Sequence, residues 1–483
     1  MNGIQVIGVL ISMLFASGAT CQYWSALGNG IKNSPGSLYV LYGDSVWDVL
    51  LFGGTVKWII DGPDSVLIRG TAQWDGTAWD SLPASLDPCS SGTICSGVFR
   101  YQRFRDDLYI NGYFSLVDTE GIVSWSFGRW NSAFGEWESL ECVNPSFGGM
   151  SFLTNISGSD TMYFTGYRGT LCGYPESCIF RYDGNEFQPF EPFNGWPGLE
   201  SDYVGLVFHF QGSLYMTGLL NNAITGNFHG FLRFNGAGWD PVPGFETPAP
   251  IKDVLIHDDK LYVCGYFFTD TGGPGNMVTV FDGEQWSDMG GGLRYALPNS
   301  TSGIAYDLHE LNGDIYVGGQ FNFAGGVHAE NVARWNGHQW CGMGGHYVTQ
   351  TPGGQVFSLA SWRDSLYVGG NFVTIDGDTL HNVAKWLGEV ENCSPSVGIE
   401  ELRESRLDLV LRMMDAEGVW ALDLPDEPQE LSIVDAFGRV VHNTSVNGRS
   451  MHTMDLRGLA IGCYFVRCTT GRGEVFRTKV FKP

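Results

Sequence analysis

Strands with apolar residues on both faces recur along most of the chain. The clearest copy, DIYVGGQF, begins at Asp314, and related strands begin at Lys260 (KLYVCGYF) and Ser365 (SLYVGGNF). A strand that is apolar on both faces is expected where its sheet is packed between two neighbouring sheets. The second residues of the LYV-type triplets are Leu51, Tyr109, Tyr163, Tyr215, Tyr262, Tyr316 and Tyr367. Their spacing is close to the roughly 50-residue period of a four-stranded repeat, and it is too long for leucine-rich and other short solenoids.

Glycines mark two further positions of the repeat. The pair Gly318-Gly319 predicts a bulge or a close approach of the backbone. Five repeats also place Asp-Gly or Asn-Gly between two aromatic-ended strands, which predicts a two-residue hairpin turn with positive φ at both positions. These pairs are Asp75-Gly76, Asp183-Gly184, Asn235-Gly236, Asp282-Gly283 and Asn336-Gly337. The flanking aromatic residues, such as Trp335 and Trp340, are predicted to pack on each other across the strands rather than to serve as ligand platforms.

The last repeat lacks the strand that follows the hairpin turn in the other repeats. The segment QYWSALGNGI (residues 22–31) resembles that missing strand. We therefore expect it to join the last repeat and close a ring, which would leave no unpaired edge. The predicted fold class is all-β, with a seven-bladed β-propeller over residues 22–392.

The repeats resemble the kelch type, with two glycines after the second strand and aromatic residues spaced behind them. The resemblance covers most of residues 22–392 and implies the propeller fold, but it implies no activity, because propellers serve enzymes and scaffolds alike. The repeats account for most residues as packing and leave variable loops for binding.

The chain changes character after a linker predicted at residues 393–402. Short alternating strands and turns predict a small β-sandwich over residues 403–483. LSIVDAFGRVV, LRGLAIGCYFV and the terminal VFRTKVFKP resemble the type A sorting domain of type IX secretion. The matching residues are Asp435, Gly438, Arg439, Leu459, Gly462, Tyr464, Arg477 and Lys479. The resemblance implies passage through the periplasm and the outer membrane, the secretion machinery as a partner, and release or anchoring at the cell surface.

The N-terminal end is consistent with export. An apolar run at residues 4–15, followed by small residues, predicts a signal peptide over residues 1–21. No later stretch reaches transmembrane length. Because exported proteins form disulfides, the two C-x5-C pairs, Cys89 with Cys95 and Cys172 with Cys178, are candidate loop disulfides, with two unpaired buried thiols as the alternative. Cys463 and Cys468 lie too far apart along one strand to pair with each other.

Charge and motifs limit the functions that remain. The chain holds 27 basic and 52 acidic residues, for a net charge of -25, which argues against nucleic acid as a partner. The acidic excess lies ahead of residue 400, so neutral glycans or proteins are expected as ligands in preference to anionic polymers. No common catalytic motif is present, and no cofactor is predicted. Calcium at Asp376-Gly377-Asp378 or beside Asp270 is a further hypothesis, with an ordinary acidic turn favoured.

Three functions are consistent with the sequence. An exported recognition or adhesion module that binds a protein or a glycan is favoured, because the repeats carry no catalytic signature. A secreted propeller enzyme acting on glycans or oxidising substrates is the alternative, since a propeller axis can gather side chains that are distant in sequence. A structural envelope component is the third.

Overall fold

Strands make up nearly all the regular structure of the protein. The computed structural model describes residues 23–28, 30–31, 37–55, 58–61, 64–68, 70–82, 97–117, 123–140, 152–155, 160–174, 176–190, 203–222, 227–245, 250–296, 303–345, 347–348, 354–375, 378–388, 393, 411–413, 419–424, 428–435, 439–447, 450–459, 462–471 and 475–482. Within these ranges the helical structure consists of one 3-10 turn, η2 (Thr269–Thr271). The predicted all-β class is confirmed. The chain divides into two compact units, residues 1–396 and 397–483. The predicted signal peptide lies outside the described residues.

The first unit is a succession of antiparallel groups of four strands, and in every group but the last these strands follow one another along the chain. We number these groups in chain order and call the first strand of each its inner strand. The first three groups are β2 (Leu38–Asp44), β3 (Val49–Gly54), β6 (Thr71–Trp74) and β7 (Trp79–Ser81); β8 (Gly97–Phe104), β9 (Asp107–Val117), β10 (Val123–Asn131) and β11 (Glu136–Ser139); and β12 (Phe152–Asn155), β13 (Met162–Gly169), β14 (Ser177–Tyr182) and β15 (Phe187–Pro189). The fourth and fifth are β16 (Tyr203–Phe210), β17 (Ser213–Asn222), β18 (Asn227–Phe234) and β19 (Trp239–Pro241); and β20 (Ile251–His257), β21 (Lys260–Gly265), β22 (Val278–Phe281) and β23 (Trp286–Ser287).

The remaining groups repeat this order. The sixth contains β25 (Ile304–Leu311), β26 (Asp314–Gln320), β29 (Val332–Trp335) and β30 (Trp340–Gly342), and the last contains β32 (Gln355–Trp362), β33 (Ser365–Asn371), β36 (Val383–Trp386) and β1 (Trp24–Ala26). A pairing of Tyr167 with Tyr203 joins the third and fourth groups into one eight-stranded sheet. Short accessory strands are β4 (Trp58–Asp61) with β5 (Asp64–Leu67), β24 (Leu293–Arg294) with β27 (Phe323–Ala324) and β28 (Val327–His328), and β31 (Tyr347–Val348) with β34 (Thr374–Ile375) and β35 (Asp378–Thr379).

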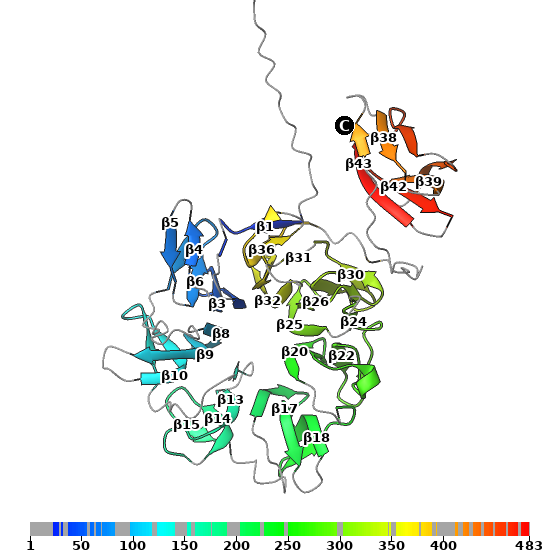
Figure 1. The fold of residues 1–483 in the computed structure, drawn as a ribbon. Helices are drawn as coiled ribbons and strands as arrows, with labels where there is room; N and C mark the ends of the chain where they lie inside the picture. The colour runs from blue at the N-terminus through cyan, green and yellow to red at the C-terminus, as the bar shows by residue number, and fades with distance from the viewer. Residues whose placement is uncertain are drawn as a thin grey trace, which may run out of the picture. The chain divides into compact units, whose positions relative to one another are not determined.

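The inner strands contact one another in chain order, and the order returns to its start. Contacts run from β2 through β8, β12, β16, β20 and β25 to β32, and β32 contacts β2. Figure 1 shows the groups following one another around a ring, with β8, β20 and β25 near its centre. The hydrophobic core is divided among the interfaces between neighbouring groups. Tyr262 and Cys264 of the fifth group, for example, pack in one cluster with Val317 and Trp335 of the sixth. This explains why the repeated strand is apolar on both faces.

The N-terminal strand completes the last group. β1 pairs antiparallel with β36, with Trp24 opposite Trp386 and Ala26 opposite Ala384. The predicted pairing of the 22–31 segment with the last repeat is therefore confirmed at Trp24–Ala26.

The glycine pair permits a bulge in the inner strand. Between β25 and β26 the register shifts at Ala305 and Asp307. A Cβ on Gly319 would lie 2.4 Å from the carbonyl oxygen of Ile304 in the bulged strand, so a side chain is excluded there. A Cβ on Gly318 would lie 2.9 Å from Val356 of the next group. The prediction that these glycines permit a bulge and a close backbone approach is confirmed. A Cβ on any of five other glycines would also lie close to a carbonyl oxygen, either in the first residue of an inner strand (Gly112, Gly218 and Gly370) or in the residue just before it (Gly54 and Gly265).

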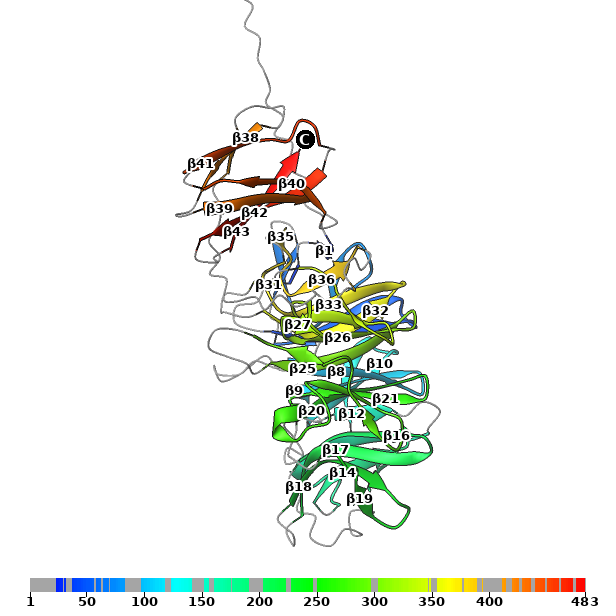
Figure 2. The same cartoon turned by 90° about the vertical axis from the view of Figure 1, so that its right-hand side faces the viewer.

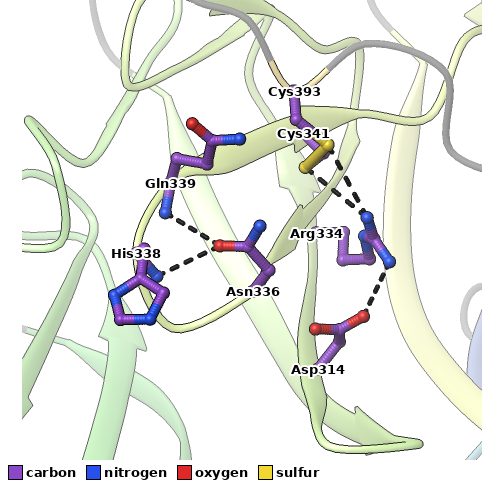
Figure 3. The surroundings of a disulfide bond; sticks show 7 residues. All are labelled: Asp314, Arg334, Asn336, His338, Gln339, Cys341 and Cys393. Atoms are coloured by element: carbon purple, nitrogen blue, oxygen red, sulfur yellow. Dashed lines mark hydrogen bonds and ion pairs between the residues drawn. A yellow bond between two sulfur atoms is a disulfide. The ribbon is translucent and has the colours of Figure 1, made fainter.

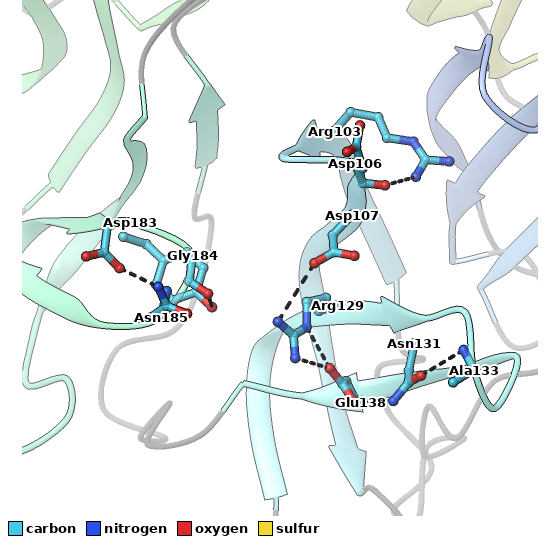
Figure 4. Close-up of polar contacts among 11 residues, drawn as sticks. Arg103, Asp106, Asp107, Arg129, Asn131, Ala133, Glu138, Asp183, Gly184 and Asn185 are labelled. Atoms are coloured by element: carbon cyan, nitrogen blue, oxygen red, sulfur yellow. Dashed lines mark hydrogen bonds and ion pairs between the residues drawn. The ribbon is translucent and has the colours of Figure 1, made fainter.

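The prediction of two-residue turns is wrong. Trp335 pairs with Trp340, so residues 336–339 form a four-residue loop. The backbone φ is positive at Gly337 (90°), but Asn336 is not among the described non-glycine residues with positive φ. The Asn336 side-chain oxygen instead accepts hydrogen bonds from the backbone N–H groups of His338 and Gln339, which is an Asx turn. The same two bonds form at Asp75, Asp183, Asn235 and Asp282, and Figure 4 shows the turn at Asp183.

The aromatic residues beside these turns pack as predicted. The rings of Trp335 and Trp340 have centroids 5.2 Å apart, and both side chains are buried.

The second unit consists of two antiparallel sheets over one core. One sheet orders β37 (Leu411–Met413), β38 (Val419–Asp423) and β41 (Met451–Asp455), and the other orders β40 (Val440–Ser445), β39 (Pro428–Asp435), β42 (Gly462–Thr470) and β43 (Val475–Lys482). Leu422 and Met454 of the first sheet share a buried cluster with Ile433, Val466 and Val480 of the second. Figure 2 shows the two sheets as separate layers.

Candidate functional site

The bulges of the inner strands carry aromatic side chains that contact one another around the ring. Tyr39, Phe99, Tyr306 and Phe357 each occupy the middle position of a bulge, in β2, β8, β25 and β32. Ring centroids are 5.1 Å apart for Phe99 and Tyr39, 5.4 Å for Tyr39 and Phe357, and 4.9 Å for Phe357 and Tyr306. All four side chains are partly exposed. We call this set the aromatic arc.

The residue after the bulge connects one group to the next. In the fifth, sixth and last groups this residue is Asp253, Asp307 and Ser358. Each side chain accepts a hydrogen bond from a backbone N–H of the following inner strand: Leu308 to Asp253 at 3.1 Å, Leu359 to Asp307 at 2.6 Å, and Leu41 to Ser358 at 3.0 Å. Because a serine forms the same bond as the two carboxyl groups, this bond requires an acceptor but no charge.

Asp253 and Asp307 form a pair of carboxyl groups that bond to each other. Burial raises the pKa of Asp307 well above its usual range, and the negative charge of Asp253 raises it further. Burial also raises the pKa of Asp253, while Arg100 and a hydrogen bond from Asp307 oppose that rise. At a pH below this raised pKa, the protonated carboxyl group of Asp307 donates to Asp253. Burial and the two carboxyl groups also raise the pKa of the adjacent Cys264 thiol, so this cysteine is an inert thiol.

Arg100 reaches the carboxyl pair from a group that is not a neighbour. It follows the bulge in β8 of the second group, and its Nη2 lies 3.7 Å from Asp253 Oδ1 in the fifth. The ring of Tyr203 packs against that of Tyr167 at an angle of 48°, with centroids 5.0 Å apart. Burial raises the pKa of Tyr203, and Arg100 opposes this rise. Lys252 occupies the bulge of β20, and burial lowers its pKa. We call Arg100, Tyr203, Lys252, Asp253 and Asp307 the polar group.

This arrangement is better suited to binding than to acid–base hydrolysis. The carboxyl groups of glycosidases are separated by at least about 5 Å, with substrate or water between them. Asp253 and Asp307 instead bond to each other, and each also accepts a backbone N–H. The aromatic arc and the polar group together provide apolar faces beside hydrogen-bonding groups, a combination typical of ligand sites.

No local sequence motif identifies this site, because its residues come from six inner strands. One signal could have found it. Aligning the repeats on the inner strand places Lys252-Asp253, Tyr306-Asp307, Phe357-Ser358 and Phe99-Arg100 at equivalent positions.

The sorting-motif residues lie in the second unit. Asp435 at the end of β39 pairs with Tyr464 of β42, which pairs in turn with Val480 of β43. Tyr464 is buried, Leu459 packs against the same core, and Arg439 is exposed. Gly462 begins β42, opposite Lys482, while Arg477 and Lys479 belong to β43. Gly438 lies outside the described residues.

The predicted pairing of Cys172 with Cys178 is wrong. Cys178 is a buried thiol, whereas Cys172 is in a disulfide. The reason is the position of Cys178 inside β14, where its side chain packs in the cluster that contains Val204 and Leu214. Cys89 and Cys95 lie outside the described residues. Cys468 retains its buried thiol, which confirms that Cys463 and Cys468 do not pair.

A disulfide that we did not predict joins Cys341 of β30 to Cys393, 52 residues further along. Figure 3 shows Arg334 beside it. Arg334 Nη2 lies 3.7 Å from the sulfur of Cys341 and 3.6 Å from that of Cys393, and Nη1 donates to Asp314 at 2.7 Å. The disulfide therefore attaches the segment that follows the last group, at Cys393, to β30 of the sixth group.

No cluster of three or more His, Cys, Asp or Glu side chains suited to a metal ion occurs among the described residues. Asp270 lies in η2, and Asp376 and Gly377 lie outside the described part of the chain. Calcium binding stays a prediction.

Comparison with known proteins identifies the second unit. Residues 416–482 match the family described as secretion system C-terminal sorting domain. The protein is therefore exported by type IX secretion, to the cell surface or the medium. In the described part of the chain, no helix is long and apolar enough to cross a membrane.

The remaining comparisons are distant. No curated protein matches the chain. Two structures of the extracellular domain of BT4673 from B. thetaiotaomicron are each 11% identical, with TM-scores of 0.43 and 0.47; they cover 95% and 94% of this chain, which spans 59% and 58% of theirs. PorZ, a surface component of the type IX secretion system of Porphyromonas gingivalis, is 9% identical with a TM-score of 0.26, over 92% of this chain and 81% of its own. These likenesses are too low to support a functional assignment.

Proposed function

We propose that the first unit is a seven-bladed propeller of kelch-like repeats that binds an extracellular protein or glycan at the centre of its ring. The circuit of contacts from β2 to β32 and back, and the pairing of β1 with β36, support the propeller. The contact of Arg100 with Asp253 across non-neighbouring groups is expected where inner strands surround a common axis.

The observation that carries the binding role is the meeting of two kinds of surface at that centre. The aromatic arc comes from the sixth, last, first and second groups, and the polar group comes from the second, fourth, fifth and sixth. Rigid strands hold both sets, so a ligand would meet groups whose positions are already fixed.

A test is to screen the secreted protein against arrays of glycans and against proteins from the surroundings of its host. Phe357→Leu should weaken retention of whatever binds, because it removes an aromatic face of the arc. The matched control is Phe134→Leu, because Phe134 is 78% exposed in the turn between β10 and β11. Equal retention by both variants would place the site elsewhere.

The alternative function is a secreted enzyme, and the direct contact between the carboxyl groups of Asp253 and Asp307, whose pKa values burial raises, is the observation in its favour. Turnover of a glycan by the secreted protein, abolished by Asp307→Asn with the fold intact, would establish the enzyme instead.

A further inference from the structure

We propose that the ring centre takes a neutral saccharide, with one pyranose face on the aromatic arc and its hydroxyl groups on the polar group. This inference rests on the proposed binding function and selects one ligand class.

The aromatic arc offers the apolar half of such a site. A pyranose ring presents a patch of C–H groups on one face, and aromatic faces attract polarised groups of this kind. Tyr39 and Phe357 are inclined to each other by 35°, whereas Phe99 and Tyr306 meet their neighbours at 89° and 76°. The rings of Tyr39 and Phe357 are therefore closer to parallel with each other than either ring is with its outer neighbour.

The polar group offers donors and acceptors for hydroxyl groups. Asp253 uses Oδ2 for the N–H of Leu308, while its Oδ1 lies 3.7 Å from Arg100 Nη2, beyond hydrogen-bonding distance. A ligand hydroxyl that lies beside both atoms can accept from the guanidinium and donate to the carboxylate. The side chains of Arg100 and Asp253 are 30% and 15% exposed, so both are accessible.

The backbone at this centre argues against a peptide. Extended peptides bind sheet edges by pairing with unoccupied N–H and C=O groups. Here the N–H groups of Leu41, Leu308 and Leu359 on three inner strands already donate to Ser358, Asp253 and Asp307. A peptide would have to displace these bonds, whereas a sugar has no need of them.

Charge favours a neutral sugar over an acidic one. Burial raises the pKa of both Asp253 and Asp307, which disfavours a second negative charge in the pair, and the guanidinium of Arg100 lies 3.7 Å from Asp253. The net charge of the whole chain is -25, which repels polyanions at long range.

The test uses the full secreted protein and immobilised hexasaccharides of glucose, mannose, xylose and galactose, with galacturonate oligomers as anionic probes. We expect retention of at least one neutral series and none of the anionic one. Phe357→Leu and Tyr39→Leu should each weaken that binding about tenfold or more, Arg100→Gln should weaken it comparably, and Phe134→Leu should leave it unchanged. Thermal unfolding of every variant serves as the check on folding.

Each other outcome overturns part of the argument. If no neutral sugar is retained, or if the variants at the centre leave its binding unchanged, the saccharide proposal is wrong. If a protein or peptide ligand loses affinity in Phe357→Leu but not in Phe134→Leu, the binding function stands and the sugar class fails. If neither sugars nor proteins respond to changes at the centre, the proposed function fails as well.

Discussion

Trp24 and Trp386 face each other across β1 and β36, with ring centroids 4.8 Å apart. One belongs to the first described strand of the chain and the other to the last described strand of the first unit. Trp24 is 2% exposed and packs with Tyr347 and Val356 in the core of the last group. The two ends of the first unit therefore stabilise each other directly.

Trp24→Ala should destabilise the first unit, because it removes a large buried side chain and the packing that retains β1. We expect the free energy of unfolding to fall by about 3–5 kcal/mol, measured by urea denaturation of the secreted protein. Ser25→Ala, in the same strand, is the control.

Deleting residues 22–31 should destabilise the first unit more than Trp24→Ala does, and it should cause aggregation through the exposed edge of β36. A deletion variant that stays monomeric with an unchanged unfolding transition would contradict the closure.

The disulfide between Cys341 and Cys393 should stabilise the same unit. Closing a loop of this length restricts the unfolded chain by about 4 kcal/mol in the chain-entropy model. We expect the double variant Cys341→Ala/Cys393→Ala to unfold at a lower urea concentration than the parent. A reductant should lower the urea midpoint of the parent and change that of the variant much less. If the reductant shifts both proteins equally, the stabilisation comes from another disulfide.

The carboxyl pair should make stability depend on pH in an unusual direction. Burial raises the pKa of Asp307 and of Asp253 in the folded state. The stability that protonation provides is fully present below the pKa of an unfolded carboxyl group, about 3.9, and is lost as pH rises through the folded values. Asp307→Asn mimics the protonated acid, since its amide can donate to Asp253 and accept from Leu359. We expect this variant to gain stability relative to the parent as pH rises from about 4 to about 8.

The measurement is the urea midpoint of both proteins at each pH, because their difference cancels the other titrating groups. Ser358→Ala serves as the control, since it removes an equivalent contact between groups without removing a titrating side chain. A difference between Asp307→Asn and the parent that stays constant with pH would mean that Asp307 does not carry the shared proton.

Removing residues 403–483 should retain the protein in the periplasm of a host with type IX secretion, because the deleted segment includes the whole sorting-domain match at residues 416–482. The first unit should remain folded, since Cys393 and the strands of the ring are kept. Cell fractionation followed by immunodetection measures the distribution. Undiminished extracellular protein would show that another segment directs export.

The sequence predicts the features that recur in every repeat. The seven marker residues from Leu51 to Tyr367 all lie in the second strand of a group, and the glycine pair indicates the bulge beside it. Features that depend on contacts between repeats were missed. Asp253 and Asp307 lie in different repeats, and nothing local distinguishes them from surface carboxylates. The pairing of Cys172 with Cys178 failed because short spacing does not reveal that Cys178 faces inward from a strand.

Pairing of β1 with β36 also sets the order in which the chain can finish folding. β1 precedes the other described strands in the chain, so it cannot pair with β36 until the last repeat has been made. Contacts between such distant segments form slowly, because a large loop must close before they contribute. The last group therefore lacks its fourth strand until the rest of the first unit has been made.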